Sequence, residues 1–148
     1  MRRILMAAVC IVGLSGSAFA VDQATEQQVR DSAAKWEKLI NKKDTATLAN
    51  EYSANAIRVT PVAAFHGRSA IQKDLEETSN IFSDITIKTS TVQSTPKGTI
   101  FCDGEWTGNM KTKDGKVVPV KGAWGVTGEI EDGRLLHHMD VYTMAPAE

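Results

Sequence analysis

The segment LLHHMDVYTM, residues 135–144, combines acid–base side chains with the composition of a β-strand. Because successive side chains of a strand point to opposite faces, His138, Asp140 and Tyr142 are expected to share one face. A histidine exchanges protons near neutral pH, and a neighbouring carboxylate or hydroxyl can orient its ring. His138 and Asp140 are therefore the candidate catalytic pair, with Tyr142 as an alternative partner of the imidazole.

His137 falls on the opposite face by the same alternation, where it is expected to meet an interface or solvent. The first face should hold Leu136, His138, Asp140 and Tyr142. The opposite face should hold Leu135, His137, Met139 and Val141.

His138 and Asp140 also allow two other roles. As satisfied core groups, bonded to Tyr142, Trp36 or a water molecule, they would be purely structural. As metal ligands they could reach one ion, with His66 as a third ligand only if its loop folds over the site. Two ligands fall short of the three or four that a zinc site needs, so we expect no metal centre. Gly-rich cofactor motifs are absent from the sequence, and no cofactor is expected.

The elements that position this segment follow the order of helices first and strands after. Apolar residues at helical spacing predict a helix over 25–44, and shorter helices are expected over 44–56, which includes Tyr52, and after Gly67. A brief strand at 57–61 stops at Pro61. Strand-like runs then cover 85–95, 99–112, 116–131 and 134–144, and the turns between them contain Gly98, Gly115 and Gly133. This order predicts an α+β fold with an antiparallel sheet.

The first 20 residues have the three parts of a secretory signal: Arg2 and Arg3, an apolar run, and Ala18-Phe19-Ala20 as the cleavage site. We expect cleavage after Ala20, a periplasmic or secreted protein, and one domain over 21–148. The apolar run is too short to span a bilayer, so no membrane association is expected after cleavage. The formal net charge of the whole chain is −1, and nothing in it points to nucleic acid.

Cys102 is the one cysteine that remains after cleavage, so a disulfide within the mature chain is excluded. It is expected either to be a small buried residue or to pair between chains.

Three stretches carry a resemblance to a known family: WEKLINKKDTATLANEYSANAIRVTP, FHGRSAI and EDGRLLHHMDVYTM. Over nearly all of 25–145 the chain resembles the nuclear transport factor 2-like superfamily, which includes ketosteroid isomerases and SnoaL-like proteins. The resemblance implies a cystatin-like α+β cone, in which helices and a curved sheet enclose a pocket. It also implies a homodimer formed through the outer face of the sheet.

The isomerase residues are missing from the positions where the resemblance would put them. Trp36 falls on the tyrosine of the oxyanion hole, Thr60 on the general-base aspartate, and Gly125, or a residue beside it, on the protonated aspartate. A threonine hydroxyl cannot act as a carboxylate base at neutral pH. The resemblance therefore implies the fold without steroid isomerisation.

The cone's expected interior is the candidate ligand-binding pocket, and its lining residues are Trp36, Tyr52, Thr60, Trp106, Met110, His138, Asp140 and Tyr142. We expect this pocket to bind a small, mostly apolar molecule. One alternative is an isomerase, lyase or hydrolase in which His138 is the general acid or base. The other is a dimeric assembly or partner-binding domain with a filled cone. Trp124 is expected to point to the outer face and to join a dimer interface with Val118, Val120 and Val126.

Overall fold

The computed structural model describes residues 20–146. The expected signal peptide lies outside this range except for Ala20, so it stays a prediction from the sequence. Among the described residues, no helix is both long enough and apolar enough to cross a membrane.

Three helices form along the first half of the described chain. Helix α1 spans Gln23–Asn41 and begins at Asp22, whose side chain accepts a hydrogen bond from the backbone N–H of Thr25 at 2.8 Å. Helix α2 spans Thr45–Ala49 and is capped in the same way by Asp44. Helix α3 spans Arg68–Ile81 and follows Gly67, which has a φ of 80° that favours glycine.

The strands form one mixed sheet in the order β2-β1-β6-β5-β4-β3, and β7 pairs with β5. Their bounds are β1 Tyr52–Val59, β2 Ala64–His66, β3 Phe82–Ser94, β4 Ile100–Lys111, β5 Val117–Glu131, β6 Arg134–Tyr142 and β7 Ala145–Pro146. Strands β3 to β6 are joined by the expected hairpins, and Gly98, Gly115 and Gly133 at the turns all have positive φ.

Two details of the sheet differ from the sequence prediction. Strand β1 pairs in parallel with β6, so the sheet is not purely antiparallel. Tyr52 is the first residue of β1 and does not belong to the short helix, which ends at Ala49. The side chain of Tyr52 is fully buried, and apolar spacing alone did not distinguish a buried strand residue from a helical one.

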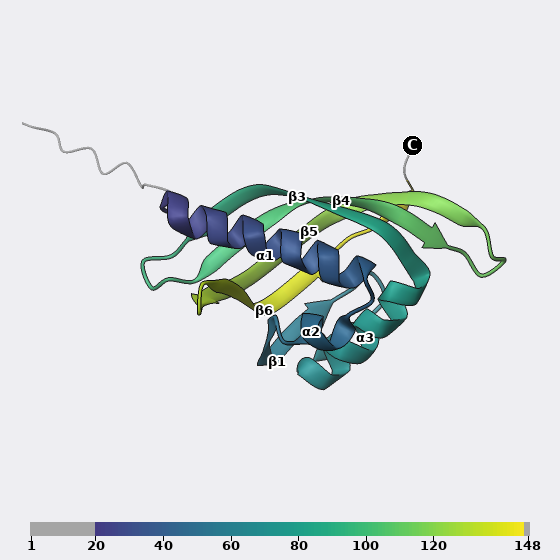
Figure 1. The fold of residues 1–148 in the computed structure, drawn as a ribbon, viewed down its shortest axis with the longest axis horizontal. Coiled ribbons are helices and arrows are strands. Elements are labelled where there is room, and N and C mark those ends of the chain that lie inside the picture. The colour runs from purple at the N-terminus through teal and green to yellow at the C-terminus, as the bar shows by residue number, and fades with distance from the viewer. Residues whose placement is uncertain (1–19, 147–148) are drawn as a thin grey trace, which may run out of the picture.

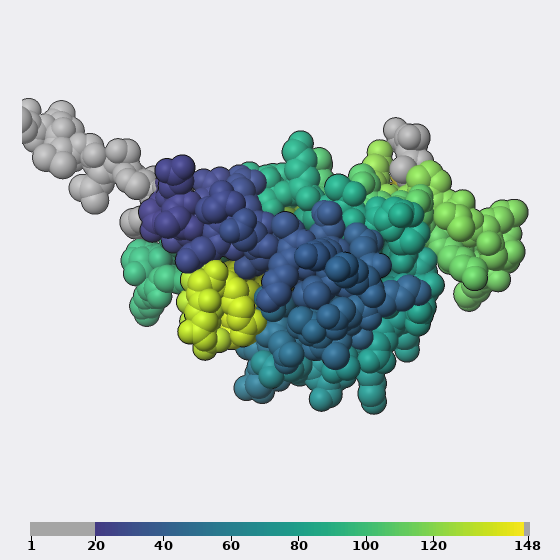
Figure 2. Space-filling model, in the orientation of Figure 1, coloured from purple at the N-terminus to yellow at the C-terminus, as the bar shows by residue number. Residues whose placement is uncertain are grey.

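The helices cover one face of the curved sheet (Figure 1). Helix α1 packs through Val29 against Ile100, Val126 and Leu135 of the central strands. Helices α2 and α3 close one end through a second cluster that contains Leu48, Ile71, Leu75 and Tyr52. The tip of the β4–β5 hairpin extends beyond the helical layer (Figure 2).

A β-bulge interrupts the pairing of β5 with β6. Thr127 pairs with Met139, but Gly128 pairs with His137, so His138 is an extra residue in β6. A bulge of this kind breaks the alternation of side chains along the strand. Residues before His138 therefore point to the face opposite to the one that simple alternation predicts.

Candidate functional site

A cavity lies between helices α1 and α3 and the covered face of the sheet. It is partly open to solvent. Its volume is about 70 Å³, counted as the space that the centre of a water molecule can occupy. One water needs roughly 10–15 Å³ in this measure, so the cavity can take something larger than a single water molecule.

Apolar side chains form most of the cavity wall. All three tryptophans of the chain, Trp36, Trp106 and Trp124, line it. The indole N–H of Trp106 donates to the carbonyl oxygen of Thr143 at 2.9 Å, and that of Trp124 donates to the carbonyl of Glu105 at 3.2 Å. Because backbone carbonyls satisfy these polar atoms, the rings are free to contact an apolar molecule.

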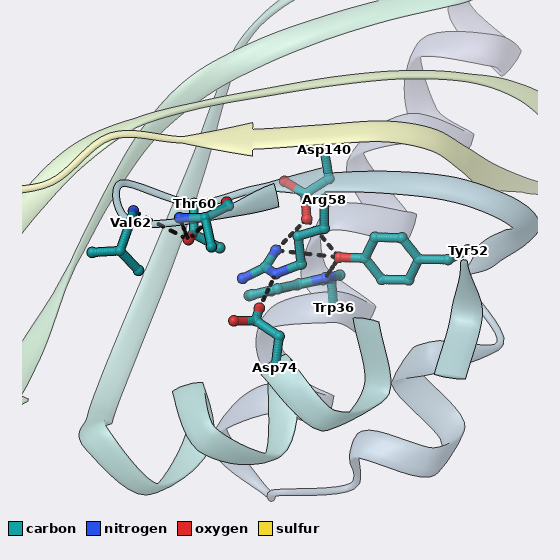
Figure 3. Close-up of polar contacts among 8 residues, drawn as sticks. Trp36, Tyr52, Arg58, Thr60, Val62, Asp74 and Asp140 are labelled. Carbon is teal, nitrogen blue, oxygen red and sulfur yellow. Dashed lines mark hydrogen bonds and ion pairs between the residues drawn. The ribbon is translucent and has the colours of Figure 1, made fainter. Parts of the chain in front are cut away.

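The polar end of the cavity is built around Arg58, a β1 residue that is only 2% exposed. Its Nε donates to Asp74 Oδ2 at 2.7 Å, and its Nη1 pairs with Oδ2 of Asp140 (Figure 3). Asp74 comes from α3 and Asp140 from β6, so the guanidinium joins three elements. We call Arg58, Asp74 and Asp140 the charged cluster.

Two aromatic residues support the charged cluster. The hydroxyl of Tyr52 donates to Asp140 Oδ2 at 2.6 Å and accepts from the indole N–H of Trp36 at 3.0 Å (Figure 3). The guanidinium also lies 5.8 Å from the ring centre of Trp36 and 5.1 Å from that of Tyr142. Both contacts are within cation–π range.

Burial and charge determine the ionisation of these groups. Burial alone would lower the pKa of Arg58, but attraction to Asp140, Tyr52 and Asp74 outweighs it and raises the pKa. Burial, reinforced by the charge of Asp140, raises the pKa of Tyr52 well above its ordinary value of 10.0. At neutral pH the guanidinium is therefore charged and the phenol of Tyr52 is a neutral donor.

Some polar atoms of the site lack a partner among the described residues. No described residue donates a hydrogen bond to Asp140 Oδ1. No described residue accepts one from Arg58 Nη2, the guanidinium nitrogen without a dashed line in Figure 3. The Nδ1 atom of His137 is fully buried and also has no partner among them. These three side chains all line the cavity, so its polar end can still form hydrogen bonds.

The bulge reverses the expected roles of the two histidines. His137 is 6% exposed and lines the cavity, whereas the side chain of His138 is 42% exposed and lies 3.4 Å from Glu129. The prediction that His138 points into the pocket is therefore wrong. Asp140 and Tyr142, which follow the bulge, do line the cavity as expected.

The other predicted pocket residues divide into two groups. Trp36 and Trp106 line the cavity. The cavity lining does not include Tyr52, Thr60 or Met110. The hydroxyl of Tyr52 reaches Asp140, and Met110 lies further along β4 than Trp106. Thr60 caps a turn. The hydroxyl of Thr60 accepts from the backbone N–H of Val62 at 3.3 Å and of Ala63 at 3.1 Å (Figure 3).

Trp124 also differs from its prediction, because it lines the cavity and does not point to the outer face. The outward residue is Gly125, which lines a second hollow on the far side of the sheet. Neither residue carries a carboxylate.

Cys102 is buried, in agreement with one of its two expected states. Burial, with the charges of Asp103 and Asp140, raises the pKa of its thiol to about 12. It is therefore a protonated thiol at neutral pH, and a poor nucleophile or metal ligand. No group of three or more His, Cys, Asp or Glu side chains within 20–146 is arranged to hold a metal ion.

Arg58 and Asp74, the two residues that complete the charged cluster, were not predicted from the sequence. The available signal was a charged residue at an inward position of each element. Arg58 stands between Ile57 and Val59 in a short apolar strand, and Asp74 precedes the buried Leu75 on α3. Charged residues are almost never buried unless they are paired, so each position implied a partner.

The environment of His137 predicts an acid-sensitive stability. Burial lowers its pKa from the ordinary value of 6.5, although Asp140 and Glu51 oppose the shift. As the pH falls below about 6.5, the unfolded chain gains a proton that the folded chain does not, so the folded state loses stability. We expect His137→Gln to lose less stability than the wild type between about pH 7 and pH 5, measured by urea unfolding.

His138→Gln is the matched control, because that side chain is half exposed. His138→Gln should lose as much folding stability as the wild type when the pH is lowered. The interpretation of His137 is wrong if its variant and the control lose equal stability.

No protein-family model matches the sequence, and no curated protein is similar to it. Among solved structures, a ketosteroid isomerase-like protein from Erwinia carotovora atroseptica aligns with a TM-score of 0.74 and 13% identity. The alignment covers 86% of this chain and 100% of that one.

Two other solved structures are similar over most of their length. Aln2 from a Streptomyces species aligns with a TM-score of 0.68 and 16% identity, over 82% of this chain and 91% of that one. A nuclear transport factor 2-like superfamily protein from Salmonella enterica serovar Typhimurium aligns with a TM-score of 0.67 and 18% identity, over 84% and 92%. The chain therefore has the nuclear transport factor 2-like fold, as expected from the sequence.

Proposed function

We propose that the cavity binds a small, mostly apolar molecule whose polar group reaches the charged cluster. One observation carries this proposal: a cavity walled by tryptophan rings ends at the buried side chains of Arg58, Asp140 and His137, and His137 Nδ1 has no partner among the described residues. Ligand sites of small molecules commonly combine apolar walls with a few placed polar groups.

The energetics of the cavity support a ligand. Transfer of apolar surface from water to the cavity wall is favourable by about 25 cal/mol per Å². A buried polar atom without a partner costs roughly 1–3 kcal/mol, and a ligand that bonds to it removes this cost. The open space also favours a ligand over the alternative of a filled cone.

A cavity-filling variant tests the proposal. Ala33 lines the cavity from α1, and Ala33→Leu would place a larger apolar side chain there without weakening the helix. We expect this variant to lose the saturable change in tryptophan fluorescence that toluene causes in the wild type. All three tryptophans line the cavity, so the signal reports on it directly.

Ala34→Leu is the matched control, because Ala34 is the next residue of the same helix and is exposed. It should bind toluene as the wild type does. Equal responses of the two variants, or no saturable response in the wild type, would contradict a binding role for the cavity.

We also propose that the protein forms a homodimer through the outer face of its sheet, though not through Trp124. Phe101, Met139 and Val141 line the hollow on that face and are 44%, 40% and 39% exposed. We call these three side chains the outer-face patch. Large apolar side chains gathered at one place on a surface often mark an interface.

Met139→Glu should shift the protein from dimer to monomer in light scattering, because an unpaired charge is costly to bury. Val62→Glu is the control, since Val62 is 90% exposed on a turn outside the patch. A wild type that is monomeric at high concentration would rule out this assembly.

A further inference from the structure

The charged cluster has an unequal number of positive and negative groups. Asp74 and Asp140 both pair with the one guanidinium of Arg58, so one negative charge is left over. All three residues are buried, at 8%, 5% and 2% exposure. A buried charge without a counter-charge is costly, so a cation bound at this place would be favoured.

The other charged groups near the cluster do not supply this cation. Lys35 and Arg134 lie beside Glu51, at 2.7 Å and 3.5 Å, and neither of these two side chains lines the cavity. His137 faces the cavity but is held neutral by burial, as described above. Tyr52 is a neutral donor at neutral pH.

The cavity has an open carboxylate oxygen and aromatic rings, and both can bind an organic cation. Asp140 Oδ2 receives the hydrogen bonds of Tyr52 and Arg58, and no described residue donates to its Oδ1. The guanidinium already has two carboxylates, so its open Nη2 is suited to a water molecule or a neutral oxygen. The rings of Trp106, Trp124 and Phe82 line the rest of the cavity, and aromatic faces attract cations.

We propose that the cavity selects a protonated amine carried on a small apolar body. The ammonium group would donate to Asp140 and complete a row of alternating charges that begins at Asp74. A neutral ligand would leave the extra negative charge in place, and a carboxylate would add a second one. This inference rests on the proposed binding role of the cavity and specifies its ligand class.

Three probes of nearly equal shape test the inference on the wild-type protein. Benzylamine, benzyl alcohol and benzoate share one ring and differ in charge at neutral pH. Each probe is titrated into the protein and its affinity is measured by tryptophan fluorescence, excited where the probes do not absorb. Benzylamine should have the highest affinity. We expect benzylamine to bind about tenfold more tightly than benzyl alcohol. A hydrogen bond to a charged group is stronger than a neutral one by a free energy that corresponds to roughly this ratio of dissociation constants. Benzoate should bind weakest.

A pair of charge-neutralising variants tests whether the charged cluster is the cause. Asp74→Asn removes the extra negative charge and leaves the Arg58–Asp140 pair intact. The preference for benzylamine over benzyl alcohol should then fall to about twofold or less. Asp103→Asn removes the same charge from the exposed outer face of the sheet and should keep the wild-type preference.

The outcomes separate this inference from the binding role. If benzyl alcohol or benzoate binds as tightly as benzylamine, the inference is wrong and the binding role stands. If none of the three probes binds, both are wrong. Equal preferences in the two variants would also overturn the charged cluster as the source of selectivity.

Discussion

Replacing Arg58 by methionine should lower the free energy of unfolding by about 3–5 kcal/mol, the cost of breaking a buried ion pair from one side. The substitution leaves the carboxylates of Asp74 and Asp140 buried without their shared partner. Urea unfolding followed by tryptophan fluorescence measures the loss. The slope against urea should stay unchanged if the native fold is kept.

Two comparisons check the cause of this loss. Lys116→Met removes an ion pair with Asp114 on an exposed turn, where the lysine side chain is 79% exposed, and should have little effect. The triple variant with Arg58→Met, Asp74→Asn and Asp140→Asn should recover part of the stability, because it leaves no unpaired charge. A loss at Arg58 no larger than the loss at Lys116 would contradict the account of the cluster.

Gly128→Ala should destabilise the fold by about 1–3 kcal/mol, a typical cost of forcing atoms into an occupied space. A Cβ at this position would lie 2.1 Å from the carbonyl oxygen of Leu136 and 3.1 Å from Leu135 Cδ1. Gly128 is the residue opposite His137 at the bulge, so the same change should also disturb the inward position of that imidazole.

Gly125→Ala is the matched control on the same strand. Its added Cβ would meet Val141 Cγ1 at 3.5 Å, which is an ordinary contact distance. Urea unfolding should separate the two variants by at least about 1 kcal/mol. Equal stabilities would mean that the close approach at the bulge does not constrain the strand.

Much of the fold follows from local signals in the sequence. Helical spacing located α1, and glycines in the turns located the hairpins of β3 to β6, because both signals depend on neighbouring residues. The parallel pairing of β1 with β6 depends on contacts between distant parts of the chain, and no local pattern encodes it. The position of Tyr52 at the start of β1 was missed for the same reason.

The candidate site was predicted only in part. Trp36, Trp106, Asp140 and Tyr142 line the cavity as expected, since alternation holds along β4 and after the bulge. It fails at His138, where β6 has an extra residue. Gly128 on the neighbouring strand was the one local hint, because a glycine within a strand can mark a bulge.

The charged cluster could not be predicted from the spacing of residues along the chain. Arg58, Asp74 and Asp140 come from three elements and meet only when β1 pairs with β6 and α3 packs beside them. A buried ion pair is often less stable than apolar packing of similar volume, so its presence calls for another reason. Its place at the end of a cavity agrees with a role in ligand recognition.

Native mass spectrometry of protein purified from the organism that makes it should show whether the cavity holds a small molecule. We predict a species heavier than the ligand-free protein by one small molecule per chain, lost on gentle activation. The same species should be absent from Ala33→Leu and present in Ala34→Leu. A wild-type spectrum with the ligand-free protein alone, or an adduct that Ala33→Leu retains, would rule out a ligand in this cavity.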